Sequence, residues 1–128
     1  MSSNWLRMAA LVGFIAVAGG AFGAHGLRSI VDAQALGWWE TGARYALGHA
    51  AALAAVAWLA DRAPGRAVTV AGLAFCAGVL VFTGSLWTMT LTGARWLGAV
   101  TPLGGAAMLV GWVSLGVAAG GLSRQAPR

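Results

Sequence analysis

The sequence predicts an all-α integral membrane protein, a single domain over residues 1–128 in which four transmembrane helices form an antiparallel up-down bundle. Composition is the first reason: 59% of the 128 residues are hydrophobic and 9% are charged, whereas about a quarter of the residues in a soluble domain are charged. The second reason is that the apolar residues form four long blocks, each close to the ~20 residues that cross a ~30 Å hydrocarbon layer. The third is that turn-forming residues separate these blocks.

The four apolar blocks set the expected transmembrane spans. Only Arg7 interrupts the first block and only His49 interrupts the apolar part of the second, while the third and fourth contain no charged residue. The uncharged stretch of the first block, residues 8–24, is longer than the roughly 7–15 residues of a signal-peptide core, so we expect this helix to be retained. The spans are expected at approximately residues 5–24, 41–60, 67–91 and 101–122.

A longer connection separates the first two spans, and within it we expect a short interfacial amphipathic helix at about residues 29–39. Ser29 and Asp32 have the spacing of a capping box, and the apolar residues that follow can share one broad face. Such a helix lies in the plane of the membrane interface. Trp38 and Trp39 would then lie at the depth of the lipid headgroups.

Helix-ending residues mark the later connections. Pro64 cannot continue a helix and Gly65 adopts turn geometry easily, so the second and third spans are expected to form a tight antiparallel hairpin. Before the fourth span, Thr101 has the position of an N-cap, and Pro102 has that of the first helical residue, where its missing N–H costs nothing.

The arginines predict the orientation, since the chain contains no lysine. If the spans alternate in direction, the side that carries both termini has five arginines, namely Arg7, Arg62, Arg66, Arg124 and Arg128. The other side has three, namely Arg28, Arg44 and Arg95. Because positive charge is enriched on the cytoplasmic side, both termini are expected in the cytoplasm. The arginines are scattered at span ends, which predicts contacts with the lipid bilayer and no nucleic-acid partner.

Small residues recur every four positions along three of the spans and predict close helix packing. In lipid, such faces let helix backbones approach each other. The same faces could serve contacts within the bundle, between copies in a homo-oligomer, or with a larger membrane complex, and the sequence leaves these uses open. The faces consist of Ala16, Gly20 and Ala24; of Ala46, Ala50 and Ala54; and of Ala107 and Gly111.

Polar residues gather toward one side of the membrane and form a candidate pocket. Thr41, Tyr45 and His49 recur at intervals of four and line one face of the second span, with His49 about 13 Å along that helix. His25, at the end of the first span, is expected on the same side. The third span also becomes polar toward this side. The candidate pocket comprises His25, Glu40, Thr41, Arg44, Tyr45, His49 and Ser85.

Within the polar half of the third span, Thr83, Trp87 and Thr90 share one helix face, and Ser85 lies on a neighbouring face. Hydroxyl groups in a helix can return their hydrogen bonds to the preceding turn. These side chains are therefore expected either to form their hydrogen bonds within their own helix or to line a polar vestibule beside the pocket.

Three interpretations of the pocket stay open. In the first, His49 bonds to a neighbouring helix and His25 caps the end of the first span, because buried polar groups in a membrane must find partners. In the second, an intramembrane histidine belongs to a proton relay or a binding pocket. In the third, the two histidines take part in a metal or haem site, toward which Glu40 and Asp32 could converge. We adopt the first, and therefore expect no bound metal or other cofactor.

On these grounds we expect a non-enzymatic structural or accessory membrane protein. No serine or histidine has a carboxylate nearby at membrane depth and no phosphate-binding loop is present, so a catalytic site cannot be assembled. The alternative is a small transporter or channel with its pocket around His25, Tyr45 and His49. Since every carboxylate falls at or outside a span end, proton coupling in such a carrier would depend on His49 alone.

Five motifs in a fixed order give the chain a family resemblance. They are GAFGAHGL at residues 20–27, Thr41-x3-Tyr45-x3-His49, FTGSLWTMTLTG at residues 82–93, TPLGG at residues 101–105, and Gly111-Trp112. With these motifs the chain resembles the small bacterial membrane proteins of the domain of unknown function 423 family, which are similar to the transmembrane protein 256 family of eukaryotes. The resemblance covers about residues 5–122.

This resemblance implies a four-span protein of the bacterial plasma membrane and brings no established activity. It also adds Thr101 to the candidate pocket, beside the residues already named. The chain departs from the family pattern at two positions: where that pattern has Thr-Ala and Tyr-Gln, this sequence has Thr41-Gly42 and Tyr45-Ala46. A glutamine next to the tyrosine is therefore absent here.

Overall fold

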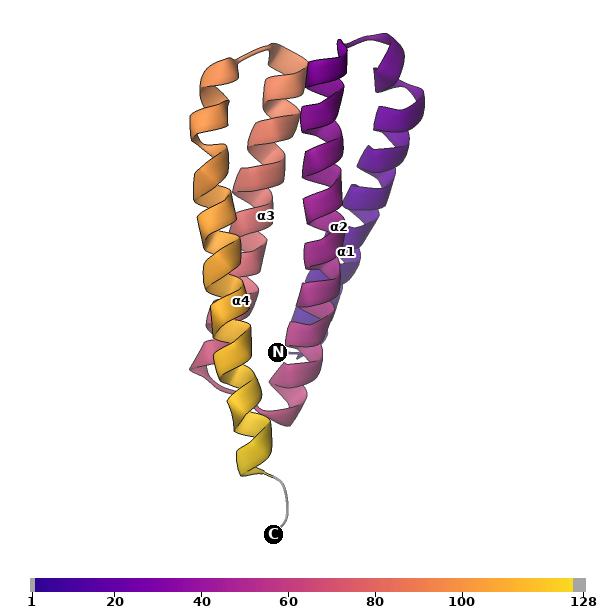
Figure 1. The fold of residues 1–128 in the computed structure, drawn as a ribbon. Coiled ribbons are helices and arrows are strands. Elements are labelled where there is room, and N and C mark those ends of the chain that lie inside the picture. The colour runs from indigo at the N-terminus through magenta and orange to yellow at the C-terminus, as the bar shows by residue number, and fades with distance from the viewer. Residues whose placement is uncertain (1, 126–128) are drawn as a thin grey trace.

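The computed structural model describes residues 2–125, and every element in that range is helical. Four long α-helices correspond to the four predicted helical segments, and short turns join them (Figure 1). Arg128, which contributes to the predicted orientation, lies outside the described residues. In chain order the elements are α1 (Ser2–His25), η1 (Leu27–Ser29), α2 (Ala33–Arg62), α3 (Arg66–Thr92), η2 (Arg95–Ala99) and α4 (Thr101–Arg124), where η denotes a 3-10 helix.

Each long helix packs against the next one along the chain, so α2 lies between α1 and α3. The connections fall at alternate ends of the molecule (Figure 1). The α1–α2 and α3–α4 connections lie together at one end, whereas the α2–α3 turn lies at the other end, toward which both described chain ends point. The fold therefore brings His25, Glu40, Thr92 and Thr101 toward one end of the molecule.

Three helical segments are long and apolar enough to cross a membrane: Ser2–Ser29, Arg66–Thr92 and Arg95–Arg124. The helix α2, predicted as the span at residues 41–60, is not among them. Together with α3 it is one of the two enclosed helices, with twelve buried residues in α2 and eleven in α3 against five in α1 and four in α4. The helix α3 is likewise packed between two neighbours and is still apolar enough to be a span, so the low hydropathy of α2 reflects its own small and polar residues.

The prediction of a separate interfacial helix at residues 29–39 is wrong. A 3-10 turn ends at Ser29, and α2 starts at Ala33 and continues without a break to Arg62. Asp32 is its N-cap, and a carboxylate oxygen accepts a hydrogen bond of 2.8 Å from the Ala35 amide. The apolar face of this segment belongs to the first turns of α2 because Trp39, which is 5% exposed, packs between neighbouring helices. At 30 residues, α2 is about 45 Å long, which exceeds a ~30 Å hydrocarbon core.

The structure has the predicted turns, but it differs from the prediction in the role of Thr101. Pro64 and Gly65 separate α2 from α3, as expected. Thr101 is the first residue of α4 rather than its N-cap. Its hydroxyl group donates to the Leu97 carbonyl at 3.2 Å and pairs with the Ser85 hydroxyl, so it is not available to cap an amide.

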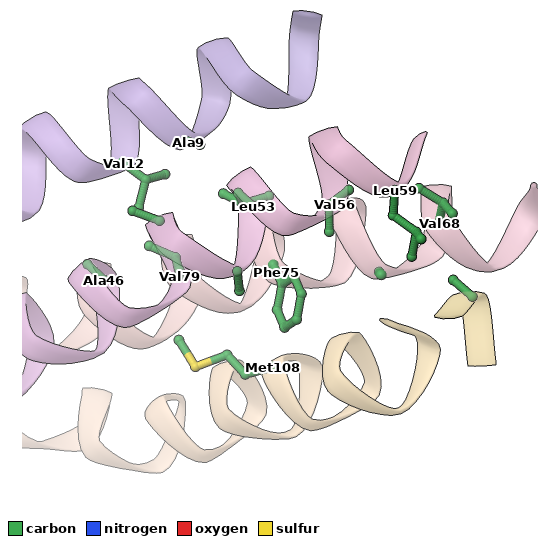
Figure 2. Close-up of a cluster of buried hydrophobic side chains, with 14 of the residues drawn as sticks. Ala9, Val12, Ala46, Leu53, Val56, Leu59, Val68, Phe75, Val79 and Met108 are labelled. Carbon is green, nitrogen blue, oxygen red and sulfur yellow. The ribbon is translucent and has the colours of Figure 1, made fainter. Parts of the chain in front are cut away.

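The hydrophobic core runs along the middle of the molecule, where side chains from all four helices meet (Figure 2). Leu53 and Val56 of α2 and Phe75 of α3 are completely buried. Figure 2 shows Val12 of α1 and Met108 of α4 reaching this core from opposite sides. The core therefore ties α2 and α3 together and attaches the outer helices to them.

Glycines let α3 and α4 approach each other at backbone distance. A Cβ atom added at Gly104 would clash with the backbone nitrogen of Phe82, and one added at Gly78 would lie 2.7 Å from the Met108 side chain. At Gly111, an added Cβ would lie 2.5 Å from the Phe75 ring. These positions have no space for a side chain, so the glycines set the separation of the two helices.

The small-residue faces of the first two spans meet each other. Cβ atoms added at Gly13 and Gly20 of α1 would lie in ordinary contact with Ala50 and Ala43 of α2, at 3.6 and 4.0 Å. Ala24 is exposed, because the predicted face turns away from α2 at the end of α1. These faces are used for packing within the chain.

The close approach of the α3 and α4 backbones at glycine positions can be tested with Gly104→Ala. The added methyl group would meet the Phe82 backbone, which cannot move away as a flexible side chain would. We expect a loss of about 1–3 kcal/mol in the free energy of unfolding, measured by SDS titration of the protein in mixed micelles. Gly105→Ala is the control, because an added Cβ there meets nothing within 4 Å and only the favourable helix propensity of alanine, up to ~1 kcal/mol, applies. Equal stability of the two variants would contradict the argument.

Candidate functional site

Two stacked indole rings form the centre of the polar contacts between helices. Trp39 of α2 and Trp87 of α3 lie with ring centroids 4.4 Å apart and planes inclined by 12°. The Trp39 indole N–H donates to the Gly19 carbonyl of α1 at 2.7 Å, and the Trp87 indole N–H donates to the Trp39 carbonyl at 3.0 Å. This tryptophan pair therefore joins three helices. Trp39 lies on the continuous helix α2 and not on a separate interfacial helix as predicted, and it is a buried packing residue.

Glycines provide the space for both rings. A Cβ atom added at Gly23 would lie 2.7 Å from the Trp39 ring, and one added at Gly42 would lie 2.9 Å from the indole nitrogen of Trp87. A Cβ atom at Gly19 would clash with the far edge of the Trp87 ring. The rings thus lie directly on the glycine backbones of α1 and α2.

Two threonines extend the contact along α3. The Thr83 hydroxyl donates to the Gly42 carbonyl at 2.8 Å, and the Thr90 hydroxyl lies 3.0 Å from the Ala35 carbonyl, both of which belong to α2. Thr90 is also 2.9 Å from the Leu86 carbonyl of its own helix, so its single proton is shared or alternates between the two. The prediction that Thr83, Trp87 and Thr90 share one face is confirmed, because all three contact carbonyls of α2.

His49 forms a second contact point, between α2 and α4. It is 7% exposed. The indole nitrogen of Trp112 lies 3.2 Å from Nε2 of His49, and Nδ1 lies 2.7 Å from the Tyr45 carbonyl. An indole N–H can only donate, so Nε2 accepts and the ring proton is on Nδ1, which donates to the carbonyl. The neutral imidazole therefore uses both of its nitrogens within the protein.

Aromatic rings surround this histidine. Phe75 and Trp112 meet it edge-on, with centroid distances of 5.5 and 5.9 Å, and Tyr45 stacks beside it at 6.3 Å. Tyr45 also contacts Phe82, at 4.6 Å. Tyr45 itself is 45% exposed, so it covers the outer edge of the cluster. The arrangement shields His49 from its surroundings and leaves its hydrogen bonds directed at protein groups.

The residues of the predicted pocket are distributed over separate places. Ser85 and Thr101 bond to each other across α3 and α4, with 2.7 Å between their hydroxyl oxygens. Tyr45 and His49 form the aromatic cluster on α2. Thr41 is half-buried. His25, Glu40 and Arg44 are exposed, as is Tyr45 at the edge of the aromatic cluster.

Within residues 2–125, no buried side-chain nitrogen or oxygen lacks a hydrogen-bond partner. In the same range, no three histidine, cysteine, aspartate or glutamate side chains come together as a metal site would require. Trp39, Trp87 and Thr83 bond to a carbonyl of another helix, and the His49–Trp112 and Ser85–Thr101 pairs also join two helices. The sequence reasoning did not identify this role for Trp39 and Trp87. The available signal was the set of glycines at positions 19, 23 and 42.

Comparison with known proteins gives consistent matches. Residues 19–105 match the family model described as Protein of unknown function (DUF423). The chain is 43% identical over 116 residues to the UPF0382 membrane protein YwdK of Bacillus subtilis, covering 90% of this chain and 94% of that relative. It is 37% identical over 126 residues to the UPF0382 inner membrane protein YgdD of Escherichia coli, covering 98% and 96%. No solved structure matches the chain.

The hydrogen bond at His49 leads to a prediction for Trp112→Phe. Phenylalanine keeps the edge-on ring contacts but removes the N–H, so Nε2 loses its donor in an apolar setting. We expect a destabilisation of about 0.6–1.7 kcal/mol, the range measured for hydrogen bonds between membrane helices. Trp96→Phe is the control, because Trp96 is 70% exposed and lies in η2. An unchanged unfolding curve for Trp112→Phe would contradict the assigned bond.

Proposed function

Because this chain belongs to the DUF423 family of proteins of unknown function, we propose that it is a four-span protein of the bacterial plasma membrane that acts as a non-enzymatic structural or accessory bundle. Its relatives are named membrane proteins, and one is named an inner membrane protein. Three of its own helical segments have the length and composition of membrane spans. The proposal adds α2 as a fourth span in an antiparallel arrangement.

The observation that supports a structural role is the use made of the buried polar side chains. Thr83 and Trp87 of α3 donate to carbonyls of α2, and Trp39 of α2 donates to a carbonyl of α1. His49, the residue most suited to proton transfer, has both nitrogens engaged. Groups that act on a substrate need a free donor or acceptor, whereas these groups are directed at the backbone or at each other.

The helix α2 is proposed as a span because of its place between α1 and α3. Those two helices meet the requirements for membrane spans, and α2 packs along both. At contacts between membrane helices, small residues let the helix backbones approach each other closely. The helix α2 has alanine at such contacts with α1. The half of α2 from Ala46 to Ala60 carries a single polar residue, His49, and its ring is satisfied internally.

Cytoplasmic termini are supported by the distribution of arginine. Arg7 near the start of α1, Arg62 and Arg66 on either side of the α2–α3 turn, and Arg124 at the end of α4 belong to one end of the molecule. Arg28, Arg44 and Arg95 belong to the opposite end. With Arg128 added from the sequence, the first end has the larger share of positive charge, which favours the cytoplasm.

The alternative function, a small transporter or channel, draws less support. It needs the polar pocket around His25, Tyr45 and His49, but His25 is exposed and the ring of His49 is directed at Trp112 and the Tyr45 carbonyl. Association with a second copy or a larger membrane complex is part of the accessory role that we propose. Such contacts would use the outer helix surfaces, because the small-residue faces of α1 and α2 pack against each other.

The four-span topology predicts a pattern of cysteine labelling. In a Cys76→Ser background, single cysteines replace the exposed residues Ser29, Gly65, Gly98 and Ser123. A maleimide that cannot cross the plasma membrane should label Ser29→Cys and Gly98→Cys in intact cells. It should label Gly65→Cys and Ser123→Cys only after permeabilisation.

Two outcomes would contradict the topology in different ways. Labelling of Gly65→Cys together with Ser29→Cys in intact cells would show that α2 does not cross the membrane. A fully inverted pattern would keep the four spans and overturn the cytoplasmic location of the termini. Labelling of all four positions after permeabilisation is the control for reactivity.

A further inference from the structure

A groove of about 540 Å³ opens between α1 and α3, and Trp87 of the tryptophan pair lies at one end of it. Ala46 of α2 forms part of its floor, with Val12 of α1 on one side and Val79 of α3 on the other. In Figure 2 the side chains of Val12 and Val79 point toward one another beside Ala46. Farther out, Ile15 and Leu80, which are 42% and 75% exposed, form the rims.

Single indole rings fill the space between α1 and α3 at one end of this groove and beyond its other end. Beyond the lining residues Met8 and Leu73, the Trp5 ring of α1 lies on α3, where a Cβ atom added at Gly72 would be 2.6 Å from it. At the other end the Trp87 ring of α3 reaches Gly19 of α1. The lining residues Leu73 and Trp87 are 14 residues apart on α3, which corresponds to about 21 Å. The groove is therefore a long slot that is about one ring wide.

The walls of the slot offer apolar contacts only. The Thr83 hydroxyl donates to the Gly42 carbonyl and the Trp87 indole N–H donates to the Trp39 carbonyl, so both polar groups in the lining are already paired. The Cys76 thiol also lines the slot and acts as a small apolar group. An occupant would have to be recognised by shape and hydrophobicity.

We propose that this slot binds one acyl chain of a membrane phospholipid. The proposal rests on the proposed function, because it takes α1 and α3 to be membrane spans that face hydrocarbon. An α-helix, with a diameter of about 10–12 Å, cannot enter a space that one indole ring fills. A hydrocarbon chain can, and the slot is longer than one leaflet of the hydrocarbon core, which is about 15 Å thick.

The test introduces a large side chain at a residue that lines the slot. Gly84 lies in the lining, and a Cβ atom added there meets nothing within 4 Å, so Gly84→Phe places a ring in the slot without a backbone clash. Gly116→Phe is the matched control, since an added Cβ at that position of α4 is equally free and lies outside the slot. Both variants and the original chain are reconstituted in vesicles of palmitoyl-oleoyl phosphatidylglycerol, extracted in mild detergent and examined by native mass spectrometry.

We expect the original chain and Gly116→Phe to retain one phospholipid per polypeptide, and Gly84→Phe to retain about tenfold less. Equal retention by all three chains would overturn the proposal. So would a dimer that only Gly84→Phe dissociates, because a second copy would then be the occupant. If the labelling pattern above shows four spans while retention is unaffected, the topology stands and only the acyl-chain site fails.

A second measurement needs no change in the slot itself. Maleimide in detergent should react with Cys76 about tenfold faster in delipidated protein than in protein supplied with the same phospholipid, because the bound chain covers the thiol. A Ser123→Cys variant in the Cys76→Ser background is the control, since that exposed position should react at one rate in both conditions. A lipid-independent rate at Cys76 would overturn the proposal even if Gly84→Phe failed to fold.

Discussion

Inside a bilayer, every side-chain N–H or O–H group that leaves water must find its acceptor within the protein, and this constraint shapes the contacts among α1, α2 and α3. The donors are Trp39, Trp87 and Thr83, and each acceptor is a backbone carbonyl of the neighbouring helix. Helix carbonyls are already bonded along their own helix, yet each keeps a second lone pair that can accept. The neighbouring helices can therefore be joined without adding a polar acceptor side chain to either one.

The carbonyls are reachable because glycine leaves the helix surface bare beside them. The Trp39 ring lies against Gly23 and donates to the carbonyl of Gly19, which is one turn earlier on α1. The Trp87 ring likewise lies against Gly42, whose carbonyl accepts from Thr83. A glycine here has two effects at once: it makes space for the ring and it exposes the acceptor. Any side chain at these positions would push the ring outward and break the hydrogen bond.

Much of this fold can be predicted from the sequence, since the lengths of the apolar blocks and the turn at Pro64 indicate the four helices. The spacing of four and three residues also puts Thr83, Trp87 and Thr90 on one helix face. The tryptophan contacts could not be predicted, because which glycine faces which indole depends on the relative register of two helices. The same limit applies to the pocket: the sequence predicts His25 and His49 in one half of the bundle, but α2 starts at Ala33, which puts His49 near the middle of that helix and buries it, while His25 is exposed at the end of α1. The prediction of an interfacial helix is wrong for a local reason. Asp32 caps the start of a helix, and no helix-breaking residue interrupts that helix before Arg62.

The helix α2 is not apolar enough to be recognised as a membrane span, because it contains many small residues and several polar ones. A span that faces lipid needs a coat of large apolar side chains, and α1, α3 and α4 have one, with residues such as Phe14, Leu80 and Leu109 largely exposed. The helix α2 has small residues at its contacts with α1, and its backbone carbonyls accept hydrogen bonds from side chains of α3. Alanine and glycine permit these contacts but contribute little hydropathy, and His49 lowers it further while being satisfied internally. Hydropathy alone therefore does not separate the central helices from the outer ones, because α3 is packed between α2 and α4 and is still the most apolar of the three candidate spans.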